Sequence, residues 1–547
     1  MAQLAEGILA ALDDEQRAVA TAVRGPVCVI AGAGTGKTRA ITHRLAYAVD
    51  IGVIDPQRIL ALTFTARAAG EMRTRLRALG VPNIAARTFH AAALKQLMYF
   101  WPEVLGGRFP QLLTTKTGFI GEALTRAGIS TTKSQAVLRD VAGEIEWSKV
   151  IGIAPDEYVR AADDYSRKSR IANNRVEPRD VARIYEAYES LKKQERAIDF
   201  EDVLLLTVGM LEEERDVRDR IRDQYRYFTV DEYQDVSPLQ QRLLDLWVGK
   251  RNDICVVGDP AQTIYSFAGA SPAFLLNFTA KYPDAEVIRL SSGYRSTPEI
   301  INTANAILRT ADLGHELDAV NDHGDRPALE GYSSESEEAE QVAAMIGADK
   351  SGGRQLHNIA ILARTNAQLE KFETILNNAG IENQIRSSER FFNRPEVREI
   401  IGAIRSASVL SDLNGDWLAE MRDVLKPFGE SEYVRAVLNL ARELANEGIS
   451  NMRAFLRELE ERAEQNNPPT LPGVTLSTLH GAKGLEWEKV YLVGASESTL
   501  PWKGESIDEE RRLFYVGITR AKQTLVLSYA GKPSPFLTEA GLIPGVK

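Results

Sequence analysis

Short apolar runs alternate with longer stretches of helical periodicity along most of the chain. In the first half these runs occupy residues 26–30, 59–64, 228–230 and 254–257. Apolar runs of this length between polar segments predict buried strands, and strands that alternate with helices predict a parallel sheet. The first half therefore predicts an α/β lobe.

A second series of apolar runs lies at residues 287–290, 359–362, 474–477, 490–493 and 524–528. Helical segments with alternating charge interrupt the two series, one at about residues 92–198 and one at about 406–469. The second segment ends in a polar connector, Gln465-Asn466-Asn467-Pro468-Pro469, whose prolines break the helix.

The expected fold class is therefore α/β, with two parallel-sheet lobes that each carry a helical insertion. The first lobe is expected at residues 1–91 and 199–285, around an insertion at 92–198. The second lobe is expected at residues 286–405 and 470–547, around an insertion at 406–469.

Composition narrows the class of protein without naming a function. Of the 547 residues, 44% are hydrophobic and 26% charged, which supplies apolar material for several cores. A net charge of -10 argues against bulk attraction to nucleic acid but leaves room for a local basic groove. Cys28 and Cys255 lie in apolar runs, where buried thiols are expected rather than a disulfide. Without a signal peptide or a run of roughly 18 apolar residues, we expect a cytoplasmic protein with no membrane contact.

A glycine-rich turn follows the first apolar run and ends in Lys37-Thr38. Glycines let backbone N–H groups curl round a polyphosphate, while a Lys reaches the outer phosphates and a Thr hydroxyl ligates Mg²⁺. The phosphate cradle would consist of Ala31, Gly32, Ala33, Gly34, Thr35 and Gly36. Ala31 departs from the strict pattern, which has Gly there. The alternative is a strand-to-helix turn without a ligand, and the flanking elements favour the nucleotide.

A second candidate segment lies about two hundred residues later, where the apolar run 228–230 leads into Asp231-Glu232. A carboxylate at the end of a strand can hold Mg²⁺, and its neighbour can orient the attacking water. We assign Asp231 to the metal and Glu232 to the water. Alone, the pair would be a solvated turn, but the phosphate loop favours catalysis.

The remaining segments resemble, in order, the motifs of UvrD/Rep/PcrA-like superfamily 1 DNA helicases. They are residues 12–16 (LDDEQ), 63–65 (TFT), 88–90 (TFH), 258–265 (GDPAQTIY), 293–297 (GYRST), 478–486 (TLHGAKGLE) and 510–522 (ERRLFYVGITRAK). This likeness spans nearly the whole chain and implies two RecA-like lobes that bind ATP and Mg²⁺ between them.

The resemblance distributes the nucleotide site over both lobes. It implies catalytic roles for Lys37, Glu232, Gln262, Arg295 and Arg520, metal ligation by Thr38 and Asp231, and nucleotide contacts by Gln16, the residues from Ala31 to Thr38, Arg39, Tyr294 and Glu486. Arginines supplied across a cleft stabilise charge on the transferring phosphoryl group. Surface ion pairing is the alternative for each arginine taken alone.

For DNA, the resemblance implies single-strand contacts by Phe64, His90, Tyr265, Phe267, Arg364 and His480. Aromatic platforms stack on bases with little regard to sequence. The alternatives are core aromatics and a structural histidine at position 90. The run Arg167-Lys168-Ser169-Arg170, with Arg175, could meet duplex phosphates, although a solvated basic face is the favoured interpretation.

Three departures from the family pattern are visible. Ala268 replaces the usual Arg, the insertion at 406–469 is short, and Ala530-Gly531-Lys532-Pro533 leaves no room for the family's strand-splitting hairpin. The short insertion resembles the second, actinobacterial type of UvrD-like helicase. That type generally continues into further domains, so either a truncated chain or a compact natural form is possible.

The expected function is an ATP-dependent 3′–5′ DNA helicase that moves on single-stranded DNA, in repair or in replication or recombination. Tailed duplex DNA and a repair or replication protein are the expected partners. The first alternative is a DNA-stimulated ATPase and translocase with little unwinding of its own. An ATP-gated clamp on DNA fits less well, because the residues expected for ATP hydrolysis are present. A small-molecule kinase fits less well, because the chain has a second lobe.

Overall fold

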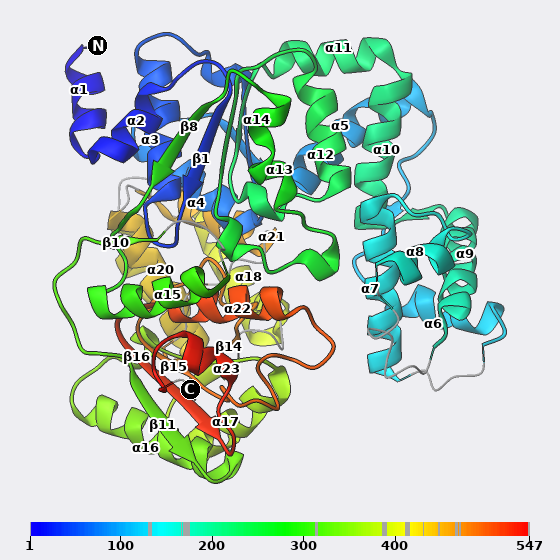
Figure 1. Cartoon of the computed structure of the whole chain (residues 1–547). Coiled ribbons are helices and arrows are strands. Elements are labelled where there is room, and N and C mark those ends of the chain that lie inside the picture. Colours follow the sequence, from blue (N-terminus) through cyan, green and yellow to red (C-terminus); the bar gives the residue numbers. More distant parts are fainter. Residues whose placement is uncertain are drawn as a thin grey trace. The chain divides into compact units, whose positions relative to one another are not determined.

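The computed structural model describes residues 2–129, 134–165, 167, 176–311, 316–385, 391–410, 416–429, 431–446, 449–464, 469 and 472–544. They form two compact units, the first built from most of the chain up to Arg289 and the second mainly from Leu290 onward. Figure 1 traces the elements of each unit.

The first unit contains a six-stranded sheet with the order β3-β2-β6-β7-β1-β8. Its strands are β1 (Val27–Ala31), β2 (Ile59–Thr63), β3 (Ala85–Thr88), β6 (Tyr227–Val230), β7 (Ile254–Gly258) and β8 (Glu286–Leu290). The pairings from β3 through β1 are parallel. The loops that follow these strands therefore share the carboxyl edge of the sheet, where α/β folds bind ligands.

Strand β8 corrects one expectation. The apolar run at residues 287–290 was expected to open the second series, but β8 lies beside β1 at the edge of the first sheet. Only Ile288 and Leu290 of this strand are buried, which is typical of an edge strand. An apolar run in the sequence predicts a strand, but it does not show which of the two sheets the strand joins.

Helices cover the first sheet and form its main core. They are α1 (Ala2–Ala10), α2 (Asp14–Thr21), α3 (Lys37–Asp50), α4 (Ala66–Ala78), α5 (Phe89–Val104), α10 (Phe200–Glu213), α11 (Arg215–Gln224), α12 (Pro238–Val248), α13 (Ala273–Leu276) and α14 (Phe278–Lys281). Leu97 of α5 and Leu204 of α10 share this core with Leu62 and Val256 of the sheet. Most of α5 thus packs with the sheet, although residues from 92 onward were expected in the insertion.

The helical insertion of the first unit has a core of its own. It is made by α6 (Thr117–Arg126), α7 (Gln135–Ile151), α8 (Tyr158–Asp164) and α9 (Pro178–Glu195), which gather in one bundle (Figure 1). Ile120, Trp147, Tyr158 and Tyr188 are buried together in it. A short parallel pair, β4 (Gln111–Leu112) with β5 (Ala197–Ile198), joins the two ends of the insertion.

The second unit contains a six-stranded parallel sheet with the order β11-β16-β15-β12-β14-β13. Its strands are β11 (Ala328–Tyr332), β12 (Ile359–Ala363), β13 (Asn383–Ile385), β14 (Val474–Thr478), β15 (Trp487–Leu492) and β16 (Ala521–Ala530). The helices beside it are α15 (Pro298–Ala311), α16 (Glu335–Ser351), α17 (Asn366–Asn378), α22 (Ile507–Ile518) and α23 (Pro535–Glu539). A two-stranded pair, β9 (Ser292–Gly293) with β10 (Asp318–Ala319), completes the unit.

The insertion of the second unit is also helical. It comprises α18 (Pro395–Leu410), α19 (Trp417–Leu425), α20 (Glu432–Asn446) and α21 (Met452–Glu464). Its buried cluster already includes Phe391 and Val397, so the helical core begins before residue 406. Of the connector expected at residues 465–469, only Pro469 lies among the described residues.

The α/β fold class with two parallel sheets is confirmed. Strands β3, β11 and β13 were not predicted, since they are short or largely exposed and lack a continuous apolar run. Cys28 and Cys255 are buried free thiols, as expected, and burial raises the pKa of Cys28 to about 12. Among the described helices none is long and apolar enough to cross a membrane.

Candidate functional site: a phosphate loop, paired carboxylates and two sheet edges

The glycine-rich turn lies between β1 and α3, as the sequence predicts. Ala31 is the last residue of β1 and is fully buried, so a small side chain suits the position where the family pattern has Gly. Gly34 and Gly36 have φ angles of +78° and +80°, which favour glycine. The Thr35 hydroxyl donates to the Gly32 carbonyl over 3.0 Å and closes the turn.

The paired carboxylates meet the first turn of α3. The Thr38 hydroxyl donates to Asp231 Oδ2 over 3.4 Å, and Lys37 Nζ lies 3.8 Å from Glu232 Oε1. Thr38 and Asp231 are 193 positions apart in the chain, and the parallel register of β6, β7 and β1 brings the two pairs to one sheet edge. The two parts of the site that the sequence predicted are therefore joined.

Burial governs the protonation of Asp231, whose side chain is almost completely enclosed. Desolvation, with the nearby Glu232 carboxylate, raises the pKa of Asp231 to about 7, while Lys37 and the Thr38 hydroxyl oppose the rise. Two carboxylates therefore share a site with a single lysine. A divalent cation would relieve this excess of negative charge, and the Asp231 carboxylate and Thr38 hydroxyl are oxygen ligands of the kind that Mg²⁺ prefers.

A hydrogen-bond chain runs from Glu232 to Gln262. The Gln234 amide donates to Glu232 Oε2 over 2.5 Å, and its carbonyl oxygen accepts from the Asp259 backbone N–H over 3.0 Å. Asp259 Oδ2 in turn accepts from Gln262 Nε2 over 2.7 Å. Gln234, which is fully buried, was not assigned a role from the sequence. Its place three residues after Asp231 was visible, but only the fold shows that it links the two segments.

Gln16 and Arg39 lie on neighbouring segments of the first unit. Asp13 caps α2 by accepting from the Gln16 backbone N–H over 2.7 Å, and the Gln16 side chain is buried. The exposed Arg39 guanidinium donates to the Ala11 carbonyl. Arg39 thus contacts the chain just before the helix that carries Gln16.

The aromatic candidates of the first unit form a connected, partly exposed group. The rings of Phe64 and Tyr265 are stacked, with centroids 5.2 Å apart and an interplanar angle of 16°. The rings of Tyr265 and Phe267 meet edge to face at 6.2 Å. Phe64 is 38% exposed, which argues against a purely structural core role. Phe64 follows β2 and Tyr265 follows β7, so the group lies at the carboxyl edge.

His90 is the second residue of α5 and contacts Phe200 edge to face, with ring centroids 6.3 Å apart. Burial, aided by the positive charge of Lys116, lowers its pKa to about 4. A neutral imidazole can stack or hydrogen-bond but brings no positive charge to a phosphate. The low pKa therefore argues against a charged contact of His90 with a phosphate, and the packing on Phe200 also fits a structural histidine.

Arg167 corrects the interpretation of the basic run. It is 6% exposed, its guanidinium pairs with Glu144 at 2.8 Å, and it lies 4.3 Å from the centre of the Trp147 ring. It also donates to the Phe267 carbonyl over 3.0 Å. Both interpretations from the sequence, a phosphate contact and a solvated face, are wrong for this residue. Lys168, Ser169, Arg170 and Arg175 lie outside the described residues.

A cluster of acidic residues, Glu189, Asp199 and Asp202, lies in the first insertion and its border with α10. Lys149 and Lys192 neutralise it: their ammonium groups lie 2.8 Å and 2.9 Å from Asp199 oxygens. The cluster is therefore a buried ion-pair network that joins α7, α9 and α10. Its lysines occupy the position that a cation would take.

In the second unit, the candidate nucleotide residues gather at the amino edge of the sheet. Glu486 precedes β15, and its carboxylate pairs with Arg295 Nε at 2.6 Å and with Lys522 Nζ at 2.8 Å. Burial raises the pKa of Glu486, but the two cations outweigh it and lower the pKa to about 2. Lys522 was not singled out from the sequence, although it closes the last motif. Tyr294, next to Arg295, is 41% exposed.

Arg520 also lies at this edge, directly before β16. Its guanidinium donates to the carbonyls of Val516 and Leu485 over 2.8 and 3.2 Å, and the side chain is almost fully buried. These bonds fix its orientation within the second unit. A charged group held in this way can meet an anion with little further loss of side-chain freedom.

Two further candidates lie at the opposite, carboxyl edge of this sheet. Arg364 follows β12 and His480 follows β14, and the backbone N–H of Leu479 donates to the Ala363 carbonyl over 2.8 Å. Arg364 makes a bidentate pair with the buried Glu510, with three contacts of 2.9–3.1 Å. The sequence did not reveal this partner, which is 146 residues away.

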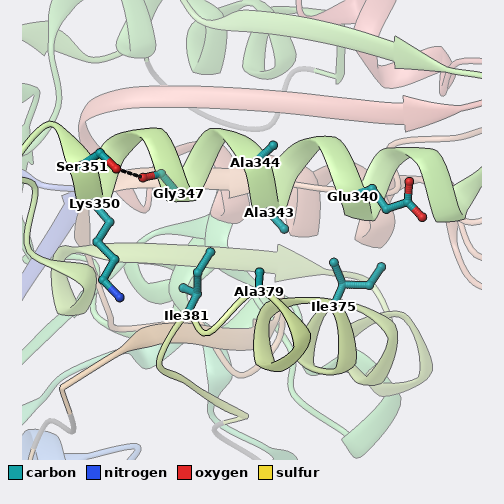
Figure 2. A pocket seen from close by; sticks show the side chains of 9 residues that line it. All are labelled: Glu340, Ala343, Ala344, Gly347, Lys350, Ser351, Ile375, Ala379 and Ile381. Atoms are coloured by element: carbon teal, nitrogen blue, oxygen red, sulfur yellow. Dashed lines mark hydrogen bonds between the residues drawn. The ribbon is translucent and has the colours of Figure 1, made fainter.

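A groove of about 470 Å³ in the second unit lies between α16 and the segment from Ile375 to Ile381 (Figure 2). Ala343, Ala344 and Gly347 form much of its wall, and the Ser351 hydroxyl donates to the Gly347 carbonyl over 2.9 Å. None of its lining residues belongs to the motifs identified from the sequence. The groove is therefore separate from the candidate sites.

Known proteins match the chain over nearly its whole length. Residues 12–283 match the family described as the UvrD/REP helicase N-terminal domain, and residues 288–411 and 418–532 match the UvrD-like helicase C-terminal domain. The ATP-dependent DNA helicase UvrD2 of Mycobacterium tuberculosis is 43% identical over 98% of this chain and 81% of its own length. The ATP-dependent DNA helicases PcrA of Leuconostoc citreum and Staphylococcus aureus are 28% and 27% identical, over 96% and 95% of this chain and 84% and 83% of their own lengths.

The two parallel sheets, with a phosphate loop and paired carboxylates at the edge of the first, define a nucleotide-driven helicase of superfamily 1. The chain belongs to the UvrD/Rep helicase family. The expected enzyme, an ATP-dependent DNA helicase, is confirmed, as is the expected similarity to the second actinobacterial type.

Proposed function

We propose that this helicase is an ATP-driven motor that moves 3′ to 5′ along single-stranded DNA. The observation that carries the proposal is the meeting of Lys37 and Thr38 with Asp231 and Glu232 at one edge of the first sheet. The polarity rests on similarity to the family's motifs. A role in repair, replication or recombination rests on the same similarity.

In the proposed chemistry, the backbone of the phosphate loop and Lys37 hold the phosphates of ATP. Thr38 and Asp231 would ligate Mg²⁺, which when bound neutralises phosphate charge. Glu232 orients the attacking water, and its hydrogen bond from Gln234 fixes the carboxylate. Gln262 would contact the γ-phosphate. A shift of Gln262 on nucleotide binding would then alter the position of Glu232, because Asp259 and Gln234 link the two side chains by hydrogen bonds.

We assign Arg295 and Arg520 to the transferring phosphoryl group and Tyr294 to the adenine face. Glu486 supports this assignment, because its carboxylate holds Arg295 at 2.6 Å and stays ionised. Gln16 and Arg39 would complete the adenine contacts from the first unit. Arginine charge brought to the transferring phosphoryl group contributes rate factors on the order of 10³ to 10⁵ in related chemistry.

We assign Phe64, Tyr265 and Phe267 to stacking on bases, with His90, Arg364 and His480 as polar contacts. The stack of Tyr265 with the partly exposed Phe64 supports the first part of this assignment. A base could insert beside these rings or displace one of them. Each base–aromatic contact is worth about 1 to 3 kcal/mol.

A translocase with little autonomous unwinding is the second candidate function. Strand β16 ends at Ala530, and α23 begins at Pro535, with Pro533 bridged to Ser496 between them. All of these residues are described, and they leave no space for a hairpin after β16. Unwinding would then need a partner protein or another part of the molecule as the wedge.

Protein displacement and duplex opening test this pair of functions. A 3′ to 5′ motor should strip streptavidin from the 5′ end of a biotinylated single strand and leave streptavidin at the 3′ end in place. Opening of a duplex with a 3′ tail, measured with the same protein and ATP, separates helicase from translocase. Salt must be matched, since phosphate contacts weaken as salt rises. Displacement from the 3′ end alone would reverse the proposed polarity.

A further inference from the structure

Asn321 lies in the loop that follows β10, and its side-chain amide bonds the backbone on both sides of Arg295. The amide nitrogen donates to the Tyr294 carbonyl over 3.0 Å and to the Ser296 carbonyl over 3.2 Å. An Asn amide carries two N–H donors, so one side chain can make both bonds at once. Asn321 belongs to none of the motifs identified from the sequence, yet it bridges the backbone of one of them.

The loop around Asn321 is itself fixed. Directly before it, the Val320 backbone N–H donates to the Gly293 carbonyl over 3.1 Å and continues the pairing of β9 with β10. Shortly after it, the Gly324 backbone N–H donates to Glu299 Oε2 over 2.9 Å, and Glu299 lies in the first turn of α15. The loop is thus attached at both ends to the elements that flank the segment it bridges.

The side chain of Arg295 has anchors outside this loop. Its Nε pairs with Glu486 at 2.6 Å, and its Nη1 donates to the Thr519 carbonyl over 3.1 Å. The next residue is held as well, because the Ser296 hydroxyl donates to the Ala521 carbonyl over 2.5 Å. The Arg295 guanidinium would therefore keep its place if the bonds from the loop were lost.

Tyr294 depends more on its backbone. It is 41% exposed, so packing restrains its ring less than it restrains the ring of a buried residue. The bond from Asn321 to the Tyr294 carbonyl fixes the peptide plane that follows the residue carrying the ring. Loss of this bond should therefore change the position of the Tyr294 ring more than that of the Arg295 guanidinium.

We propose that Asn321 is a positioning residue that holds the Tyr294 ring in place for the adenine base, and so sets the affinity for nucleotide rather than the rate of hydrolysis. The inference rests on the proposed function, in which Tyr294 contacts the adenine face. The competing interpretation is that Asn321 only stabilises the turn between β9 and α15. Because Asn321 is exposed, its replacement should leave the second unit folded.

The test combines the equilibrium affinity for ADP, steady-state ATP hydrolysis at saturating oligo(dT), and competitive inhibition by inorganic tripolyphosphate, which has no base. Asn321→Ala should weaken ADP binding about three- to tenfold and raise KM for ATP with it, while kcat stays close to that of the parent. The inhibition constant of tripolyphosphate should not change. Asn321→Asp keeps the size of the side chain but loses both N–H donors, so it should match Asn321→Ala.

Asp322→Ala, at the exposed neighbouring residue, is the matched control and should leave all three measurements unchanged. The double variant of Asn321→Ala with Tyr294→Ala shows whether Asn321 acts through the ring. Once the ring is absent, Asn321→Ala should add little further weakening of ADP binding. The same added weakening in both backgrounds would overturn the proposal.

Two other results would also overturn it. Weaker binding of tripolyphosphate along with ADP would assign Asn321 a structural role, and a lower kcat at unchanged ADP affinity would assign it to Arg295. Failure of the proposed function gives a different pattern, because Tyr294→Ala would then leave ADP affinity unchanged, which removes the adenine contact and the proposal together. Weaker ADP binding by Tyr294→Ala but not by Asn321→Ala would overturn the proposal alone.

Discussion

At the scale of single residues, Glu232 has an unusual backbone conformation that positions its carboxylate. Its φ angle of +53° is left-handed, a conformation that costs a non-glycine residue on the order of 1 to 3 kcal/mol. In this conformation the carboxylate lies near Lys37 and accepts from Gln234, while the Glu232 backbone N–H donates to Asp231. The strained backbone thus turns the two adjacent carboxylates toward different partners.

Glu232→Gln tests the assignment of the water-orienting residue. The amide keeps the size of the side chain but cannot accept a proton, so turnover in the presence of single-stranded DNA should fall about 10²- to 10⁴-fold. Affinity for a fluorescent ATP analogue should stay within a few-fold. Glu213→Gln, at an exposed residue near the end of α10, is the control. Turnover near the parent rate would remove Glu232 from the mechanism.

Asp231 makes the nucleotide-free protein sensitive to pH. Its pKa of about 7 in the folded state exceeds the usual value of about 3.9, so the folded state binds the extra proton between these values. The free energy of unfolding should therefore fall as the pH rises from about 4 to 7. Asp231→Asn removes the buried charge, and in thermal melts without Mg²⁺ it should gain several degrees over the parent at pH 8 and little at pH 4.5.

Asp284→Asn is the control for this measurement, because Asp284 is an exposed carboxylate of the same unit. A constant difference between Asp231→Asn and the parent at all pH values would show that the carboxylate is not desolvated. The same Asp231→Asn protein should hydrolyse ATP poorly, which separates stability from activity.

Arg295 can be tested against its neighbour Lys522, since both pair with Glu486. Arg295→Ala should lower turnover on the order of 10³-fold with little loss of ATP affinity, because its charge acts mainly on the transition state. Lys522→Ala removes the other partner of Glu486 and should reduce turnover far less. Equal effects of the two substitutions in steady-state kinetics would contradict the role given to Arg295.

At the scale of elements, α7 is tied to the loop that carries the aromatic group. Arg167 connects the two, through its pair with Glu144 on α7 and its bond to the Phe267 carbonyl. Tyr158 donates to the same Glu144 carboxylate over 2.8 Å. This buried network fixes the insertion to a segment proposed to contact DNA.

Glu144→Ala should destabilise the first unit by about 3 to 5 kcal/mol, because it leaves the Arg167 charge buried without its partner. Chemical denaturation measures the loss in the free energy of unfolding. The affinity for single-stranded DNA should fall as well, since Arg167 would no longer be held in place to donate to the Phe267 carbonyl. Glu122→Ala is the matched control: it removes an exposed pair with Arg126, worth about 0 to 1 kcal/mol. Similar losses in the two variants would show that the network carries little energy.

The elements show where prediction from the sequence succeeds. β1 and β6 are buried strands, and each is followed by residues whose types and spacing form a recognisable motif. The contact of Lys37 and Thr38 with Asp231 and Glu232 was therefore predictable. β8 was placed in the wrong sheet because pairing between distant strands leaves no local pattern. Glu510 was missed as the partner of Arg364 for the same reason, since 146 residues separate them.

At the scale of the whole molecule, the two parallel sheets arrange the candidate residues differently. The first sheet carries both the phosphate loop and the aromatic group at its carboxyl edge. The second has the Arg295–Glu486 cluster at its amino edge and Arg364 at its carboxyl edge. Coupling between nucleotide and DNA is therefore expected to pass through the first sheet's loops, where the Asp259–Gln262 segment leads directly to Tyr265.

The most direct test of the account is steady-state ATP hydrolysis by the full chain with and without single-stranded DNA. Because Gln262 and Tyr265 lie on one short segment, occupation of the aromatic group by a strand should reorganise the catalytic carboxylates. We predict that saturating oligo(dT) raises turnover at least tenfold, and that Tyr265→Ala lowers this stimulation while leaving the basal rate close to that of the parent. Equal rates with and without DNA, in a protein that demonstrably binds the strand, would contradict the coupling on which the account depends.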